Sequence, residues 1–199
     1  LVDLQSCSSG QIVFDLLTFL NIDISKEIAI CLYASILSDT GGFRHGHGSI
    51  QAHKTAAALL STGIDPQAVY RNVFENITLE KVLQLGKCLS KIKIESDGAI
   101  VWTVQEYPVI DSGIGASYRV VEIIRAINGV KIAVFFEENY VKNETHISFR
   151  SNDPDIDVAR IACEFGGGGH REASGASVKM EDPTDIRETV IKTLQKVLE

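Results

Sequence analysis

The sequence predicts an α/β protein in which a helix-dominated first part is followed by a mixed α/β second part. Up to about residue 90, apolar residues recur at helical spacings of three and four, as between Ile12 and Leu20. Beyond that point, β-branched and alternating segments flank Asp97-Gly98, a dipeptide typical of tight hairpin turns. We therefore place a domain boundary near residue 90, which gives domains at 1–90 and 91–199.

Polar residues mark the starts of the helices expected in the first part. Ser8-Ser9, Ser25 and Thr78 each precede an apolar helical run and can act as N-caps. Asp65-Pro66 opens a further helix with proline at its first position. The helix that follows Ser25 ends close to Asp39, and functional side chains are commonly presented at such element ends.

The second part alternates strands with helices. The pattern predicts strands at 91–94, 100–104, 130–136 and 145–149, and helices at 120–127, after Asp157, and at 185–198. Strands that alternate with helices are typical of mixed α/β domains.

Composition limits the classes of function. The chain has 199 residues, 45% of them hydrophobic, and its apolar runs are too short to cross a bilayer, so we expect a cytoplasmic protein. A net charge of −7 argues against a protein that coats long nucleic acids. A small nucleotide needs only a local basic cluster, for which the candidates are Arg44, His45, His47, Arg150, His170 and Arg171.

The four cysteines occur singly, at positions 7, 31, 88 and 163, without a Cys-x-x-Cys pair. The spacing therefore indicates neither a zinc site nor a disulfide framework. Three of them lie in apolar helical patterns, where we expect buried structural thiols.

The run from Phe165 to Arg171 contains four consecutive glycines followed by a histidine. Such a run costs conformational entropy unless a ligand or another backbone approaches the main chain closely. Arg150, at the end of the preceding strand, can fork onto phosphate oxygens, while N–H groups and His170 supply further donors. The glycines alone fit a flexible loop or a close helix–strand contact equally well, but the adjoining His170 and Arg171 favour an anion site.

The run from Ser38 to Arg44 reads Ser-Asp-Thr-Gly-Gly-Phe-Arg. By ordinary turn chemistry, an aspartate before Thr-Gly is more often a turn or cap residue. Its hard carboxylate oxygens also suit Mn²⁺ or Mg²⁺. His45-Gly46-His47 does not by itself indicate zinc, because side chains two apart on a strand diverge.

These two motifs, in this order, resemble the DHH phosphoesterase superfamily and its DHH-associated C-terminal domain. The resemblance covers nearly the whole chain and is closest to the branch of nano-RNA hydrolases with 3′-phosphoadenosine-5′-phosphate phosphatase activity. It implies the helix-rich remainder of a DHH catalytic domain followed by a smaller mixed α/β substrate-binding domain. It also implies that Asp39 is a catalytic ligand in a centre of two Mn²⁺ ions, with Mg²⁺ as the alternative metal. The substrate-binding residues that it implies are Arg44, His45, Arg150, Ser151, Gly167, Gly168, Gly169 and His170.

One feature departs from the family pattern. The chain contains no Asp-His-His triplet, which the family carries on the N-terminal side of the Asp-Thr-Gly motif. We therefore expect a fragment that lacks the first part of the catalytic domain and is inactive alone.

The resemblance implies a metal-dependent phosphoesterase that acts on short RNA or DNA oligonucleotides or on small nucleotides, with a homodimer as a candidate assembly. The same motifs fit a phosphodiesterase of cyclic or linear dinucleotides. Two non-enzymatic alternatives are a nucleic-acid-binding module, similar to the appendage of alanyl-tRNA synthetases, and a degenerate relative that binds nucleotide without turnover. The Asp39 motif and the acidic net charge count against a pure RNA binder.

Overall fold

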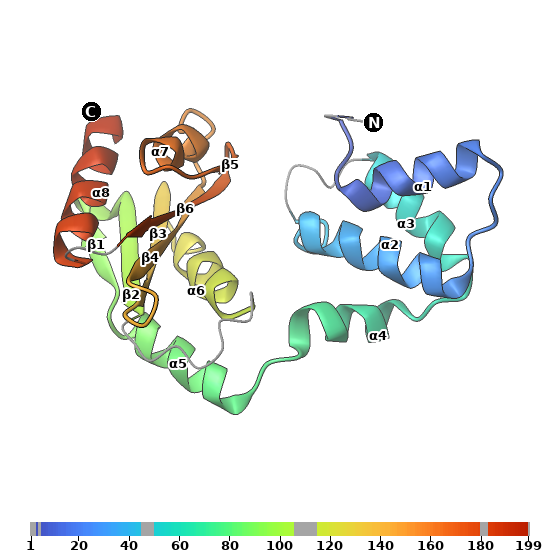
Figure 1. Cartoon of the computed structure of the whole chain (residues 1–199), viewed down its shortest axis with the longest axis horizontal. Helices are drawn as coiled ribbons and strands as arrows, with labels where there is room; N and C mark the ends of the chain where they lie inside the picture. The colour runs from blue at the N-terminus through green and yellow to red at the C-terminus, as the bar shows by residue number, and fades with distance from the viewer. Residues whose placement is uncertain (1–2, 4, 45–49, 106–114, 180–182, 199) are drawn as a thin grey trace. The chain divides into compact units, whose positions relative to one another are not determined.

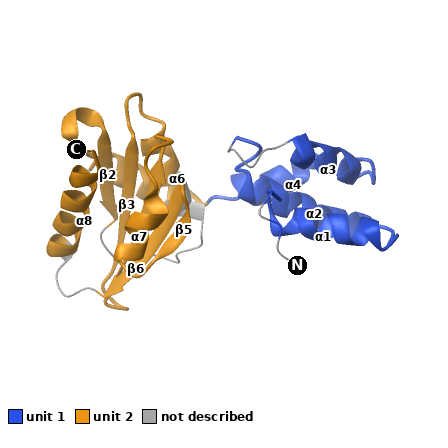
Figure 2. Ribbon diagram, turned by 90° about the horizontal axis from the view of Figure 1, so that it is seen from above, with its two compact units in different colours: residues 1–77 blue, residues 78–199 orange. Residues whose placement is uncertain are grey.

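The computed structural model describes residues 3, 5–44, 50–105, 115–179 and 183–198 (Figure 1). The chain divides into two compact units, Leu1–Ile77 and Thr78–Glu199 (Figure 2). The α/β class predicted from the sequence is confirmed. The division falls earlier than the boundary predicted near residue 90, because the helix Leu79–Leu89 packs in unit 2, where Cys88 is buried beside Val101 and Val121.

Unit 1 is helical throughout its described part. The predicted caps are present: the Ser8 hydroxyl accepts from the Gln11 N–H at 3.0 Å, and the Asp65 carboxylate accepts from the Gln67 N–H at 2.9 Å. The helices are α1 Ser9–Phe19, α2 Lys26–Asp39, α3 Ile50–Leu60, α4 Pro66–Tyr70 and the π-helical turn η1 Arg71–Glu75.

The core of unit 1 forms where α1 and α2 cross closely. A Cβ atom at Gly10 would lie 2.7 Å from Cβ of Ser35, so only glycine permits this approach. Beside the crossing, α2 buries Ala29, Ile36 and Leu37 against α3. Their burial holds the C-terminal end of α2, and with it Asp39, in a defined position.

Unit 2 combines helices with strands. Its helices are α5 Leu79–Leu89, the 3₁₀ turn η2 Ser96–Gly98, α6 Gly115–Arg125, α7 Val158–Glu164 and α8 Pro183–Leu198. Its strands are β1 Lys93–Glu95, β2 Ile100–Gln105, β3 Ile132–Asn139, β4 Glu144–Ser151, β5 Gly168–His170 and β6 Ala173–Lys179.

The described strands form one sheet in the order β1-β2-β3-β4-β6-β5. The hairpin predicted at Asp97-Gly98 is confirmed, since Lys93 pairs with Trp102 in antiparallel β1 and β2. Strands β2 and β3 are parallel and are connected through α6, whereas the other neighbouring strands pair antiparallel. The sequence did not predict β5 and β6.

Helices cover both faces of the sheet (Figure 1). On one face, Phe136 and Phe149 pack against α7 and α8. On the other face, Val101 and Phe135 pack against α6 and the C-terminal end of α5. This three-layer arrangement leaves the edge strand β5 at one side of the sheet, where it can meet solvent.

Two other predictions are tested by the fold. Within the described ranges, no helix combines the length and apolar character needed to cross a membrane. Cys7 and Cys88 are buried, but Cys31 and Cys163 are exposed, so the prediction of buried structural thiols was wrong for the latter two. Both lie on the solvent-facing side of helices whose other side packs in a core.

Candidate functional site

The Asp39 motif folds into a fixed turn at the end of α2. The Gly42 N–H donates to the Leu37 carbonyl at 2.8 Å, and the Gly41 N–H donates to the Ser38 carbonyl at 3.2 Å. This pair of hydrogen bonds is the Schellman motif, which requires a left-handed residue just beyond the helix. Gly41 meets that need with a φ of 57°, and Gly42 follows with a φ of 73°.

The residues after the glycines are also held tightly. The buried Thr40 hydroxyl donates to the Ile36 carbonyl at 2.7 Å and accepts from the Phe43 N–H at 2.9 Å. Phe43 has a φ of 66°, an uncommon and strained conformation for a bulky side chain. Its ring stacks on His53 with centroids 4.6 Å apart, and this contact helps to hold the strained residue.

Asp39 is the last residue of α2, and its side chain is exposed. The C-terminal end of a helix carries partial negative charge, and the last turn of α2 contains no basic residue, so a cation is favoured beside this carboxylate. Within the part of the chain that the structure describes, no cluster of three or more His, Cys, Asp or Glu residues could hold a metal ion. Among the described residues, Asp39 is therefore a candidate for a single ligand of a divalent cation.

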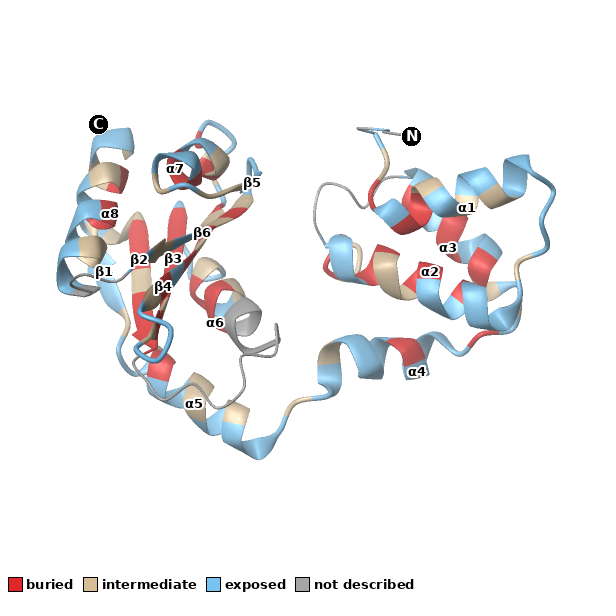
Figure 3. Ribbon diagram, in the orientation of Figure 1, coloured by how far each residue is buried: buried red, intermediate tan, exposed pale blue. Residues whose placement is uncertain are grey.

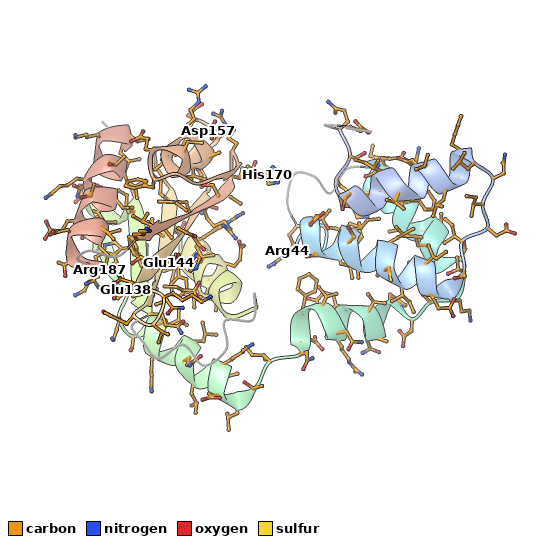
Figure 4. All side chains as sticks on the ribbon, in the orientation of Figure 1. Arg44, Glu138, Glu144, Asp157, His170 and Arg187 are labelled. Carbon is orange, nitrogen blue, oxygen red and sulfur yellow. The ribbon has the colours of Figure 1, made fainter. Side chains whose placement is uncertain are left out.

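Arg44 lies on the turn that follows α2 (Figure 4), five residues after Asp39. Its Nε donates to the Gly41 carbonyl at 2.8 Å, which fixes the guanidinium against the turn. Two histidines singled out in the sequence, His45 and His47, lie outside the described residues.

In unit 2, the sheet register brings together two residues that the sequence singled out. Arg150 on β4 pairs with Ala173 on β6, and Ala173 pairs in turn with His170 on β5. Directly opposed residues point to the same face of a sheet, so Arg150 and His170 flank the small side chain of Ala173. Two strand spacings put their Cα atoms about 10 Å apart.

The next row of paired residues across the same three strands extends this surface. Ser148 on β4 pairs with Gly175 on β6, which pairs with Gly168 on β5. Residues two apart along a strand share a face, so this row lies beside the first. We call the surface the glycine floor and define it by Ser148, Arg150, Gly168, His170, Ala173 and Gly175. All six residues are half-buried or exposed, and Arg150 and His170 have the largest side chains among them.

Helix α6 holds Arg150 in place. The Arg150 Nε donates to Oε1 of Glu122 at 2.8 Å, and its Nη1 donates to the Phe149 carbonyl at 2.9 Å. Both charged side chains are about one-seventh exposed, at 14% for Arg150 and 13% for Glu122. Arg125 lies 3.8 Å from the same carboxylate oxygen. Glu122 is thus a positioning residue that sets the plane of the guanidinium at the edge of the floor.

The four glycines serve different purposes. Gly166 has a φ of 73°, which ends α7. A Cβ atom at Gly167 would collide with the Gly175 carbonyl oxygen, and one at Gly169 would lie 2.7 Å from the Ala173 carbonyl oxygen. Neither a left-handed backbone nor a steric clash explains Gly168. Its φ lies outside the left-handed region, and nothing lies within 4 Å of the added Cβ atom. Neither backbone conformation nor contacts among the described residues require glycine at position 168.

Two residues near the floor have structural roles. Ser151 was predicted to bind substrate, but it is 3% exposed and its hydroxyl donates to the Asp153 carbonyl at 2.9 Å. It also points to the face opposite Arg150, because neighbouring residues of a strand alternate. Arg171 donates through Nη2 to the Pro154 carbonyl at 2.6 Å and braces the turn before α7.

A separate cavity of about 420 Å³ lies on the other face of the sheet, beside α8 and Trp102. Its cations are paired: Arg187 lies 3.4 Å from the buried Glu138 carboxylate (Figure 4). Lys192 lies 3.1 Å from Glu188.

Sequence reasoning missed Glu122, Ser148, Ala173 and Gly175. The signal for the last two was the small-residue run from Ala173 to Ser177, which permits a strand with a bare face. Glu122 gave no such signal, because it lies 28 residues from its partner Arg150.

Residues 111–196 match the DHHA1 domain family, and this range contains all of the glycine floor. Over 198 residues, the chain is 28% identical to the bifunctional oligoribonuclease and PAP phosphatase NrnA of Thermus thermophilus, a match that covers 99% of this chain and 59% of that protein. Residues 111–196 thus carry a DHHA1 domain, and the matches along the rest of the chain are consistent with the DHH family.

Other relatives show similar coverage. The NrnA protein of Bacillus subtilis is 27% identical over 175 residues, covering 87% of the chain and 54% of that protein. The crystal structure of an exopolyphosphatase-related protein from Bacteroides fragilis superposes with a TM-score of 0.79 at 28% identity, covering 98% of the chain and 56% of that structure. The chain therefore spans a little over half the length of these relatives.

Proposed function

We propose that this chain is part of a Mn²⁺-dependent phosphoesterase that hydrolyses short oligonucleotides and 3′-phosphoadenosine 5′-phosphate. The observation that carries the proposal is the glycine floor, an open surface with a fixed arginine on one side and a histidine on the other. The printed names of the two NrnA relatives, which describe an oligoribonuclease and PAP phosphatase, support the same substrate class.

The floor suits the end of a short nucleotide chain. Arg150 offers planar, charge-assisted hydrogen bonds to phosphate oxygens, and His170 offers a ring N–H from the opposite side. Because Ala173 between them is small and Gly168 beside His170 carries no side chain, a phosphate or a sugar can lie directly against these strands. The net charge of −7 opposes binding along a long nucleic acid, so a ligand held at its end is favoured.

Asp39 and Arg44 would serve the chemical step. Asp39 would be one ligand of Mn²⁺ or Mg²⁺, and a divalent ion of this kind activates water and neutralises charge on phosphate oxygens. Arg44, fixed on the same turn, would orient a phosphate oxygen of the substrate. In this proposal, unit 1 supplies the chemistry and unit 2 holds the substrate.

The test is release of mononucleotide from a 5′-labelled dinucleotide in the presence of Mn²⁺. It compares this chain with the longest natural polypeptide that contains it. The proposal expects hydrolysis that Asp39→Ala abolishes and Arg150→Ala weakens mainly through KM. Binding of the dinucleotide without hydrolysis in either form, and without any effect of Mn²⁺, would contradict the proposal and favour a nucleotide-binding module.

Gly168→Ala and Gly168→Val are the matched variants for the substrate site. They add side chains where the folded protein has open space, so the fold is expected to remain intact while affinity falls with side-chain size. Unchanged affinity in both variants would contradict the assignment of the floor as the substrate site.

A further inference from the structure

A third row of paired residues continues the glycine floor. Glu137 on β3 pairs with His146 on β4, and His146 pairs in turn with Ser177 on β6. Residues two apart along a strand share a face, so these three residues, which we call the third row, lie on the face of Arg150 and Ser148. Figure 3 shows how buried residues alternate with half-buried or exposed ones along β4 and the first part of β6. All three belong to unit 2, and the register of its own sheet fixes their arrangement.

Among the described strands, the floor can continue in one direction only. Strand β4 ends at Ser151 and β6 begins at Ala173, so the paired strands stop at the row that contains Arg150. In the other direction, the second row has no side chains at Gly168 and Gly175. Each row advances about 7 Å along the strands, so the third row lies about 14 Å beyond the row of Arg150.

A hydrogen bond holds the imidazole of His146. The Ser177 hydroxyl lies 2.7 Å from its Nδ1 atom, which fixes the plane of the ring. When the hydroxyl donates to Nδ1, the ring proton lies on Nε2, so Nε2 is a hydrogen-bond donor. Among the described residues, Nε2 has no hydrogen-bond partner. The third row therefore offers one N–H group that no described residue accepts.

Glu137 adds an acceptor beside this donor. Directly paired residues of neighbouring strands have Cβ atoms about 5 Å apart, so the side chains of Glu137 and His146 rise next to each other. Glu137 is half-buried, and within the described part of the chain it forms no ion pair. An ionised carboxylate only accepts hydrogen bonds, and carboxylates hold ribose hydroxyl groups in dinucleotide-binding folds. A single hydroxyl group can donate to Glu137 and accept from His146 at the same time.

This combination selects a neutral hydroxyl group rather than a second phosphate. The Glu137 carboxylate repels an anion, whereas a hydroxyl group carries no charge and satisfies both neighbours. The nucleotide that carries the held phosphate lies over the second row, because about 14 Å exceeds the distance from a phosphate to the ribose of its own nucleotide. The third row therefore meets the ribose of the next nucleotide.

We propose that the third row binds the 2′-hydroxyl of this second nucleotide, so that the floor prefers RNA to DNA. The inference rests on the proposed function, in which Arg150 and His170 hold a terminal phosphate. The 2′-hydroxyl is the group that distinguishes RNA from DNA, and it both donates and accepts hydrogen bonds. A single nucleotide ends before the third row and gains no affinity from it.

Calorimetric titration in the absence of divalent metal measures this preference without hydrolysis. The ligands are a 5′-phosphorylated diadenylate, the same compound with deoxyribose at its second nucleotide, and 3′-phosphoadenosine 5′-phosphate. The wild-type chain is expected to bind the all-ribose dinucleotide about tenfold more tightly than the deoxyribose one. His146→Ala and Glu137→Ala should each abolish most of this difference by weakening the all-ribose dinucleotide alone. Affinity for 3′-phosphoadenosine 5′-phosphate should stay unchanged, which also shows that the variants fold.

Ser177→Ala tests the fixing of the His146 ring. It is expected to reduce the preference for the all-ribose dinucleotide about threefold, because the ring loses its hydrogen bond. Thr189→Ala is the matched control, since it removes an exposed hydroxyl group from α8, which packs against the opposite face of the sheet. It should leave the preference unchanged.

The three ligands separate failure of this inference from failure of the proposed function. Equal affinity of the wild-type chain for the two dinucleotides, with binding of 3′-phosphoadenosine 5′-phosphate retained, would overturn the inference and leave the proposed function standing. A preference that survives both His146→Ala and Glu137→Ala would overturn it by placing the 2′-hydroxyl contact elsewhere. Failure of all three ligands to bind would contradict the proposed function itself, and the inference with it.

Discussion

The turn after α2 and the run before β6 both contain consecutive glycines, but they need glycine for different reasons. In the turn, Gly41 and Gly42 supply left-handed backbone that closes a helix end. In the run, Gly167 supplies space for the backbone of β6. Gly168 supplies neither, and it lies in the row next to Arg150, Ala173 and His170, on the same face of the sheet.

This difference shows that the structural reason for each glycine of a glycine-rich motif has to be determined before the motif is interpreted as a ligand site. A glycine required by backbone conformation or by close packing carries no information about a ligand. A glycine that the folded protein does not need, beside fixed polar side chains, does carry it. The predictions below follow this distinction, from the largest expected effect to the smallest.

Gly167→Ala should destabilise unit 2 strongly. The added methyl group would collide with the Gly175 carbonyl oxygen and lie 2.7 Å from Ala176 Cβ, so the free energy of unfolding should fall by about 3 kcal/mol. Urea denaturation followed by circular dichroism measures this change. Gly168→Ala is the matched control, with an expected change in unfolding free energy of less than about 0.5 kcal/mol. Equal losses of unfolding free energy in both variants would contradict the different roles assigned to Gly167 and Gly168.

Arg150→Ala should lower both stability and nucleotide affinity. It leaves the Glu122 carboxylate without its 2.8 Å partner, at a cost of about 2 kcal/mol in unfolding free energy. The double variant Arg150→Ala/Glu122→Ala also removes the carboxylate that lost this partner, and it should recover most of the stability but none of the affinity. Calorimetric titration with 3′-phosphoadenosine 5′-phosphate makes the comparison. If affinity returned along with stability, Arg150 would have only a structural role.

Gly42→Ala should destabilise unit 1 moderately. Its φ of 73° is unfavourable for alanine, so we expect a loss of about 1 kcal/mol in unfolding free energy. Gly42→Asn should lose less, because asparagine tolerates the left-handed region better. Thermal unfolding of the two variants distinguishes a conformational need from a steric one. Equal losses would point to the nearby rings of Tyr70 and Phe74 instead.

The smallest expected effects concern the reactivity and ionisation of the four cysteine thiols. At pH 8, iodoacetamide should modify the exposed Cys31 and Cys163 quickly and the buried Cys7 and Cys88 slowly, as peptide mass spectrometry can show. Burial raises the pKa of the Cys88 thiol from 9.0 to about 11. The unfolded chain therefore ionises first, and the stability that Cys88 contributes is present below pH 9 and lost as the pH rises towards about 11. Rapid modification of Cys88 at pH 8 would contradict its burial.

Much of the fold could be predicted because it depends on local signals. Ser8 and Asp65 cap their helices as expected, and Asp97-Gly98 forms the expected hairpin. The strand from Ala173 to Lys179 escaped prediction, because its small residues lack the β-branched and aromatic character that marks strands. Its pairing depends on the sheet around it, which no local pattern encodes.

The candidate site was predictable in its residue types but not in its arrangement. The sequence identified Arg150, Gly168 and His170, yet only the register of three strands shows that they share a face. It also assigned Ser151 to the substrate, although alternation along β4 turns this residue to the opposite face. The contact between Glu122 and Arg150 spans two elements and has no local signature.

The most direct test of the glycine floor is to record the amide NMR spectrum of the chain during titration with 3′-phosphoadenosine 5′-phosphate. The account predicts that the largest shifts in unit 2 fall on Ser148, Gly168 and Gly175, and that Gly168→Val removes them. Shifts that are largest around Trp102 and α8, on the opposite face of the sheet, would contradict the account.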